Sequence, residues 1–160
     1  MLIRAACIAF FLLPFSLSHA SDALERIEAI SEDMTSLMFD AMLNEMGAEG
    51  VDTSKLAELV PSTEWDEPMR DAGRCVLDRF TAQIGDDGVD TMLDQMEARL
   101  PEIRAGGMEA IDQLGSLLPE GISEAEADAI NSECGMTRLM REKMMNPEFM
   151  SAVMSLMSEN

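Results

Sequence analysis

The chain has 160 residues, and its 31 acidic side chains outnumber its 11 lysines and arginines, which gives a formal net charge of −20 at pH 7. A charge this negative repels phosphate backbones and anionic lipid surfaces, so we expect no nucleic-acid partner. The chain also has no tyrosine, a single tryptophan and six phenylalanines, too few aromatic side chains to stack on bases.

The first twenty residues have the pattern of a secretory signal peptide. One basic residue, Arg4, precedes an apolar run over 5–15, and the small-residue motif SHA ends at Ala20. The apolar run is shorter than the roughly 20 residues that cross a bilayer, and we expect neither a membrane span nor a lipid anchor. We predict that 1–20 is cleaved and that 21–160 is one exported domain. The bacterial periplasm is the expected location, with the extracellular medium as the alternative.

Removal of this leader changes the chemistry of the chain. The only histidine, His19, is lost, and loss of Arg4 changes the net charge from −20 to −21. Without histidine or tyrosine, the usual general base, zinc ligand and phenolic acid are missing. We therefore expect a protein that is not an enzyme and that holds no cofactor.

Two cysteines, Cys75 and Cys134, stay in the predicted mature chain. In an oxidising, exported compartment an isolated pair is typical of a disulfide. The bond would close a loop of about 60 residues and stabilise the fold by roughly 4 kcal/mol, through loss of chain entropy in the unfolded state. A redox or metal-binding pair is the alternative, but no histidine is available to assist it.

The first predicted helix of the mature chain runs from Asp22 to Met46, because its apolar residues recur at spacings of three and four. Gly47 and Gly50 end it. A short helix is expected over 53–60 and stops at Pro61.

Three helices are predicted in the middle of the chain. One covers 69–84 and is closed by Gly85, and the next covers 89–100 and ends or kinks at Pro101. A short helix over 108–118 follows two glycines.

The C-terminal part carries two clear helix starts. Ser123 and Glu126 have the spacing of a capping box, which opens a helix through Met144. Asn146 and Pro147 then open a last helix. No stretch alternates as a strand does, so we predict an all-α fold, a single small domain of about five to seven helices fastened by one disulfide.

Methionine is unusually abundant, with 16 in the whole chain. In the first helix Met34, Met38, Met42 and Met46 recur at every fourth position, and each step turns the helix by about 400°, so the row drifts by about 40° per step. With Leu37 and other neighbours, the apolar arc exceeds the stripe of about 100° that a surface helix buries. This helix is therefore expected to be central in a bundle, or to bury a second face against another molecule.

Three interpretations of the methionine row stay open. Flexible methionine side chains fill a core that lacks bulky aromatics, or they form a permissive apolar surface for a partner. Alternatively, thioether pairs bind a soft ion such as Cu(I) or Ag(I). Interleaved leucine and phenylalanine, and the missing histidine, argue against the metal.

Segment 34–44 has a partial echo at 136–146. MTSLMFDAMLN and MTRLMREKMMN are identical at six of eleven positions. A duplicated unit or a pair of equivalent binding helices would explain the echo, and so would a shared composition. The alignment pairs three methionines of one segment with three of the other: Met34, Met38 and Met42 with Met136, Met140 and Met144.

The few basic residues cluster near the two cysteines. They predict either a positive patch for a small anion or an acidic peptide, or ordinary helical ion pairs such as Asp66 with Arg70 and Arg74 with Asp78. The cluster consists of Arg70, Arg74, Arg79, Arg138, Arg141 and Lys143.

From the sequence we expect an exported, non-enzymatic binding or interaction protein. Its partner is a protein, a hydrophobic ligand or a second copy of the chain. The alternatives are periplasmic soft-metal binding, with Met34, Met38, Met42 and Met46 as Cu(I) ligands, and a purely structural methionine core. The predicted partner-binding face is apolar and joins the two methionine-rich helices: Met34, Leu37, Met38, Met42, Met46, Met136, Met140 and Met144.

Overall fold

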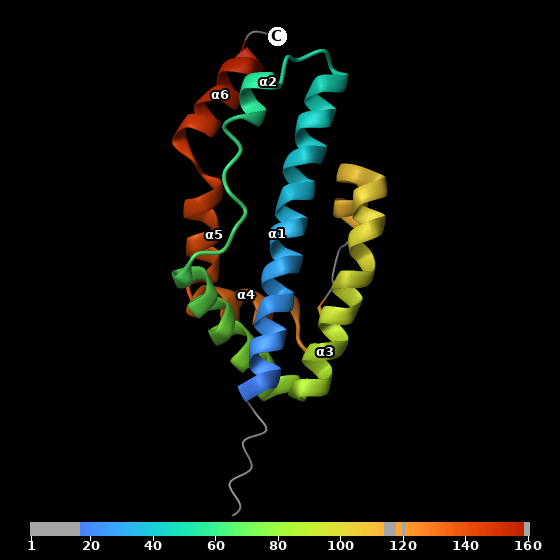
Figure 1. Cartoon of the computed structure of the whole chain (residues 1–160), viewed down its shortest axis with the longest axis vertical. Coiled ribbons are helices and arrows are strands. Elements are labelled where there is room, and N and C mark those ends of the chain that lie inside the picture. The colour runs from blue at the N-terminus through green and yellow to red at the C-terminus, as the bar shows by residue number, and fades with distance from the viewer. Residues whose placement is uncertain (1–16, 114–117, 120, 159–160) are drawn as a thin grey trace, which may run out of the picture.

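The computed structural model describes the backbone of residues 17–113, 118–119 and 121–158, and the side chains of 20–106, 118–119 and 121–156. All regular structure in these ranges is helical, which confirms the predicted all-α class (Figure 1). Six helices are described: α1 (Leu17–Ala48), α2 (Ser54–Ala57), α3 (Glu67–Gln113), α4 (Glu124–Glu133), α5 (Met136–Met144) and α6 (Pro147–Ser158).

The predicted signal peptide lies almost entirely outside the described residues. α1 begins at Leu17 and runs without interruption through Ala20, so the predicted cleavage point falls in its first turn. The first buried side chain described in α1 is Leu24, at 8% exposure. Cleavage after Ala20 therefore leaves all of the described core in the mature chain. None of the described helices is both long enough and apolar enough to cross a membrane.

α3 is bent into two arms, residues 67–84 and 86–113. Gly85 has φ +74°, the left-handed conformation that glycine adopts at no steric cost. The chain reverses there, so the first arm descends and the second ascends beside α1 (Figure 1). The sequence predicted two helices separated at Gly85, and a third starting near 108, but the structure has one bent element. Pro101 lies inside the second arm and does not end it.

The helix predicted from Ser123 to Met144 is also different in the structure. Its start is confirmed, because Ser123 and Glu126 form the capping box in both directions. Gly135, however, has φ +80° and divides the segment into α4 and α5. This turn was missed because a single glycine inside a periodic apolar pattern is often tolerated in a helix.

Arg26 attaches α1 to the second arm of α3. Its guanidinium donates to Glu97 at 2.8 Å, to Asp94 at 2.6 Å and to Asp90 at 3.4 Å. These carboxylates are spaced by four and three residues, which places them on one helix face. The hydrogen bond with Glu97, more than any other contact, raises the pKa of Arg26 above its ordinary value.

Glu28, half a turn further along α1, attaches the same helix to the first arm. Arg70 donates to both of its carboxylate oxygens, with a shortest distance of 2.5 Å. The Glu28 side chain is only 15% exposed. The hydrogen bonds with Arg70 hold the pKa of Glu28 below its ordinary value of 4.5.

The disulfide predicted between Cys75 and Cys134 is confirmed. It joins the first arm of α3 to the end of α4, with the two Cα atoms 5.7 Å apart. Beside it, Arg79 donates to Glu133 at 2.8 Å and links the same two helices. The bond therefore fastens α4, and α5 that follows it, to the α1–α3 pair.

The described core has two parts. The main cluster lies among α1, α3, α4 and α5, and includes Ile30, Met69 and Leu93, each no more than 2% exposed. The second cluster consists of Phe39, Leu56 and Phe149 and joins α1 to α2 and α6. There the two phenylalanine rings meet edge to face, with centroids 5.4 Å apart.

We predict that the paired substitution Cys75→Ala, Cys134→Ala lowers the free energy of unfolding by about 4 kcal/mol, because the unfolded chain regains the entropy of a long loop. Chemical denaturation followed by circular dichroism measures it. A reducing agent should bring the wild type to the stability of the variant and leave the variant unchanged. Equal stability of oxidised wild type and variant would contradict the prediction.

We predict that Glu28→Gln lowers the melting temperature by about 2–4 °C at pH 7. The stabilisation from the Glu28–Arg70 pair is complete above a pH of about 4.5, the ordinary value, and is lost as the pH falls through the lowered folded-state pKa. The difference in melting temperature between wild type and variant should therefore disappear in acid. Melting curves measured from pH 7 into the acid range test this. A difference in melting temperature that grows in acid would be the contrary result.

Candidate functional site: a methionine-lined cavity

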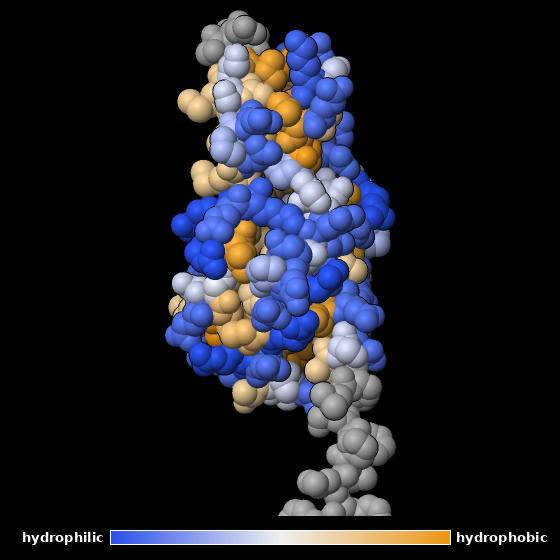
Figure 2. Space-filling model, turned by 60° about the vertical axis from the view of Figure 1, so that its left-hand side comes forward, coloured by the Kyte–Doolittle hydropathy of each residue, from blue (hydrophilic) through white to orange (hydrophobic). Residues whose placement is uncertain are grey.

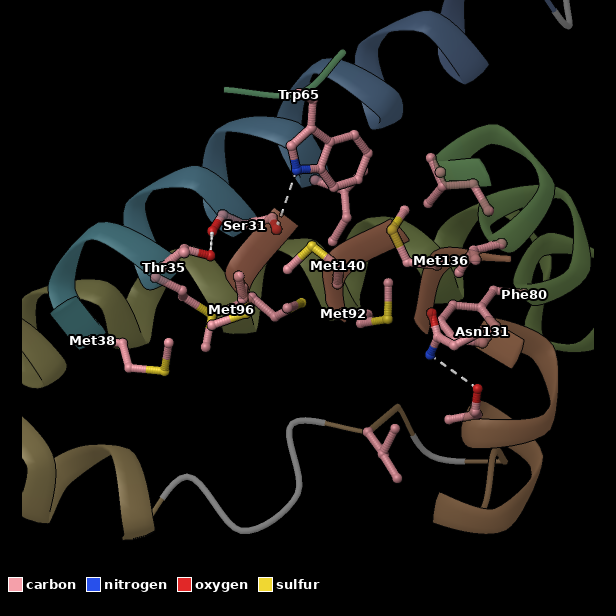
Figure 3. Close-up of a pocket in the computed structure, with 18 of the residues that line it drawn as sticks. Ser31, Thr35, Met38, Trp65, Phe80, Met92, Met96, Asn131, Met136 and Met140 are labelled. Carbon is pink, nitrogen blue, oxygen red and sulfur yellow. Dashed lines mark hydrogen bonds between the residues drawn. The ribbon is translucent and has the colours of Figure 1, made fainter. Parts of the chain in front are cut away.

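A cavity of about 480 Å³ lies between α1, α3, α4 and α5. Its lining is drawn in Figure 3, where methionine side chains from several helices point toward a common space. We call it the methionine cavity, because seven of its lining residues are methionines: Met34, Met38, Met92, Met96, Met136, Met140 and Met144.

α1 contributes one face to the methionine cavity. Ile27, Ser31, Met34 and Met38 recur at spacings of four, three and four, so they lie on a single helical stripe. Met34 and Met38 are half-buried, and Met34 packs against the main core cluster. This part of α1 therefore contributes to both the main core cluster and the lining of the methionine cavity.

The two arms of α3 supply the opposite side. Val76 and Phe80 come from the first arm, and Met92 and Met96 from the second. Met92 is 4% exposed and Phe80 is 7% exposed, so their positions are fixed by core packing. The bend at Gly85 is what brings these two stretches of one element to the same space.

α5 contributes Met136, Met140 and Met144, again at every fourth position. All three are half-buried. Their helix follows the turn at Gly135, directly after the disulfide at Cys134. The covalent bond therefore holds in place the helix that covers the methionine cavity.

Trp65 covers part of the same space and is the only tryptophan of the chain. Its indole Nε1 donates to Ser31 Oγ at 3.3 Å (Figure 3), and its backbone N–H donates to Glu32 Oε1 at 2.8 Å. The ring is 6% exposed and lies over Gly73 of α3. A Cβ atom at Gly73 would approach the ring to 2.5 Å, so glycine is required there by close packing.

Three uncharged polar side chains interrupt the apolar lining. Thr35 Oγ1 donates to the backbone oxygen of Ser31 at 2.7 Å, and Asn131 Nδ2 donates to the backbone oxygen of Ala127 at 2.9 Å. Both bonds are drawn in Figure 3. No charged side chain lines the cavity among the residues that the structure describes.

The predicted partner-binding face is only partly assembled in this cavity. Five of its residues line the space, namely Met34, Met38, Met136, Met140 and Met144. The other three do not: Met42 and Met46 pack against the second core cluster, and Leu37 is half-buried outside both clusters.

The row considered for Cu(I) is therefore divided between two environments. Met34 and Met38 line the methionine cavity, whereas Met42 and Met46 face Phe39 and its neighbours. In the described part of the chain, no group of three or more histidine, cysteine, aspartate or glutamate side chains could hold a metal ion. The thioethers that line the methionine cavity come from α1, α3 and α5.

Sequence reasoning missed Met92, Met96 and Trp65 as lining residues. Met92 and Met96 share one face of a predicted helix, so their pairing was visible, and the sequence predicted a break at Gly85, but it does not give the direction of the chain after that break. Trp65 lies in an irregular segment whose path depends on contacts with α1.

The echo between 34–44 and 136–146 has a structural counterpart. The first two aligned pairs, Met34 with Met136 and Met38 with Met140, all line the methionine cavity. The third pair, Met42 and Met144, packs against the second core cluster, and Met144 also reaches the cavity. Both segments thus supply the same kind of surface to one space.

Four of the six basic residues near the disulfide are paired with carboxylates, but not with the partners that the sequence predicted. Arg70 pairs with Glu28 of α1, because the carboxylate of Asp66 accepts the backbone N–H of Met69 at the start of α3. The other pairs are Arg74 with Asp71, Arg79 with Glu133 and Arg138 with Glu142. Lys143 donates to the backbone oxygen of Glu64.

The face of the molecule that Figure 2 shows is mainly hydrophilic, and apolar groups are interspersed along its length. The described methionines with the most exposed side chains are Met145, at 54%, and Met154, at 68%.

Comparison with known proteins gives this chain no family: no family model matches it, and neither a curated protein nor a solved structure does.

We predict that Gly73→Ala destabilises the protein by about 1–3 kcal/mol, because the added methyl group collides with the buried ring of Trp65. Gly47→Ala is the matched control: Gly47 lies in the last turn of α1, and a Cβ there meets nothing within 4 Å. It should be neutral or stabilising by up to about 1 kcal/mol. Denaturation monitored by Trp65 fluorescence compares them, and equal effects would contradict this assignment of Gly73.

Proposed function

We propose that this protein is an exported, non-enzymatic binding protein that holds an apolar small molecule in the methionine cavity. The observation that carries the proposal is the cavity itself, about 480 Å³ in volume and lined by seven methionines, Trp65 and Phe80. Pockets for small molecules commonly have volumes of about 300–1,000 Å³ and mostly apolar walls with few polar groups.

The chemistry of the lining supports binding over catalysis. Its described polar side chains are two hydroxyls and one amide, from Ser31, Thr35 and Asn131, and none of the described lining residues is titratable. Methionine side chains are unbranched and polarizable, and they adapt to ligands of different shape. This lining suits a cavity that binds apolar molecules of different shapes.

The exported location is part of the same proposal. The leader pattern over 1–20 supports it, and so does the disulfide between Cys75 and Cys134, since such bonds persist in oxidising compartments. On this proposal the mature domain is 21–160, and the periplasm is its compartment.

A second candidate function is soft-metal binding in the same cavity. It is favoured by the convergence of methionines from α1, α3 and α5, because thioethers prefer Cu(I) and Ag(I). The ligands would then come from the cavity set and not from the α1 row alone.

The test uses Trp65 as a built-in reporter. We predict that the neutral apolar dye N-phenyl-1-naphthylamine binds at one site and accepts excitation energy from Trp65. Met140→Gln should weaken binding about tenfold, because a buried amide without a partner is costly. Met140→Leu, which conserves volume and polarity, should leave the affinity within about threefold.

Met154→Gln makes the same chemical change at an exposed position and should leave dye binding unchanged. Loss of binding in that variant, or full binding in Met140→Gln, would place the dye elsewhere and contradict the proposal. Titration with Ag(I) separates the two candidates. Displacement of the dye by one equivalent of Ag(I) favours the metal, and retention of the dye favours the apolar ligand.

A further inference from the structure

We infer that the methionine cavity selects uncharged amphiphiles that carry a hydrogen-bond donor, such as long-chain alcohols, and rejects the corresponding carboxylates. This inference rests on the proposed function and names the class of its ligand. Three observations carry it: the charge of the lining, the orientation of Asn131 and the charge of the whole chain.

The lining offers no counter-ion for an anion. Among the described residues the cavity is walled by apolar side chains, two hydroxyls and one amide. The internal residues whose side chains lie outside the description add no cation, because 107–117 contain neither lysine nor arginine. A carboxylate that entered would lose its water and gain no opposite charge, which is costly.

Asn131 presents an acceptor to the cavity. Its amide nitrogen donates to the backbone oxygen of Ala127 at 2.9 Å, and only the nitrogen can make that bond. The amide orientation is therefore fixed, and Oδ1 points toward Met136 and Phe80 (Figure 3). An alcohol O–H can donate to this oxygen, whereas an ionised carboxylate only accepts and is repelled by it.

The negative net charge of the chain also disfavours anions, and it acts over a longer range than the cavity lining. The formal net charge is −20, and Arg70, Arg74, Arg79 and Arg138 near the disulfide are each paired with a carboxylate. A protein with this field lowers the local concentration of anions. Long-range repulsion and local desolvation can be separated, because only the first is screened by salt.

The experiment compares 1-decanol with decanoate as competitors of N-phenyl-1-naphthylamine at a pH where decanoate is ionised. We expect decanol to bind at least about tenfold more tightly. The preference should persist in about 1 M NaCl, where the screening length is about 3 Å. Equal competition by the two compounds in high salt would overturn the inference while leaving the proposed function intact.

Asn131→Lys provides the converse test, with circular dichroism to verify that the variant folds. A cation at this position should raise decanoate affinity by about tenfold and reduce the preference for decanol. Asn131→Leu is the matched control, and it should weaken decanol without improving decanoate. A decanoate affinity that is unchanged in a folded Asn131→Lys variant would also overturn the inference. If the dye does not bind the wild type at all, the proposed function fails, and the inference fails with it.

Discussion

Arg26 and Glu28 form ion pairs on different sides of α1, and these pairs hold α1 between the two arms of α3. The remaining helices pack around α1 and these two arms. Arg26 reaches three carboxylates of the second arm, and Glu28 is held by Arg70 of the first. Each pair is partly exposed and individually weak. Their role is to fix the direction and register of α1, while buried apolar side chains supply most of the stabilisation.

The methionine cavity follows from this arrangement. α1 and the two arms of α3 line this space, and α4 and α5, fastened through Cys134, complete its lining. Methionine suits such a position, because its flexible thioether fills irregular gaps without the rigid shape of an aromatic ring. The rigid elements are few: Trp65, held from α1 by two hydrogen bonds, and Phe80 in the main core.

Much of the fold was accessible from sequence because local signals and tertiary packing agree. The capping box at Ser123 and the cap at Asn146 predicted where their helices start, and the apolar period of the first helix predicted α1. The errors lie at glycines. Gly85 bends a helix that the sequence divided in two, and Gly135 divides a helix that the sequence joined. Glycine permits either outcome, so the neighbouring packing decides.

By itself the sequence determined an acidic, helical, methionine-rich chain with one disulfide, because composition, period and cysteine number are local or additive properties. It also identified Met34, Met38, Met136, Met140 and Met144 as apolar helix faces. Only the tertiary structure decided that they meet around one cavity, that Met92 and Met96 join them from the returning arm of α3, and that Met42 and Met46 do not. An apolar helix face has the same spacing of residues whichever surface it packs against. The surface that it packs against is set by long-range contacts, which no local sequence pattern encodes.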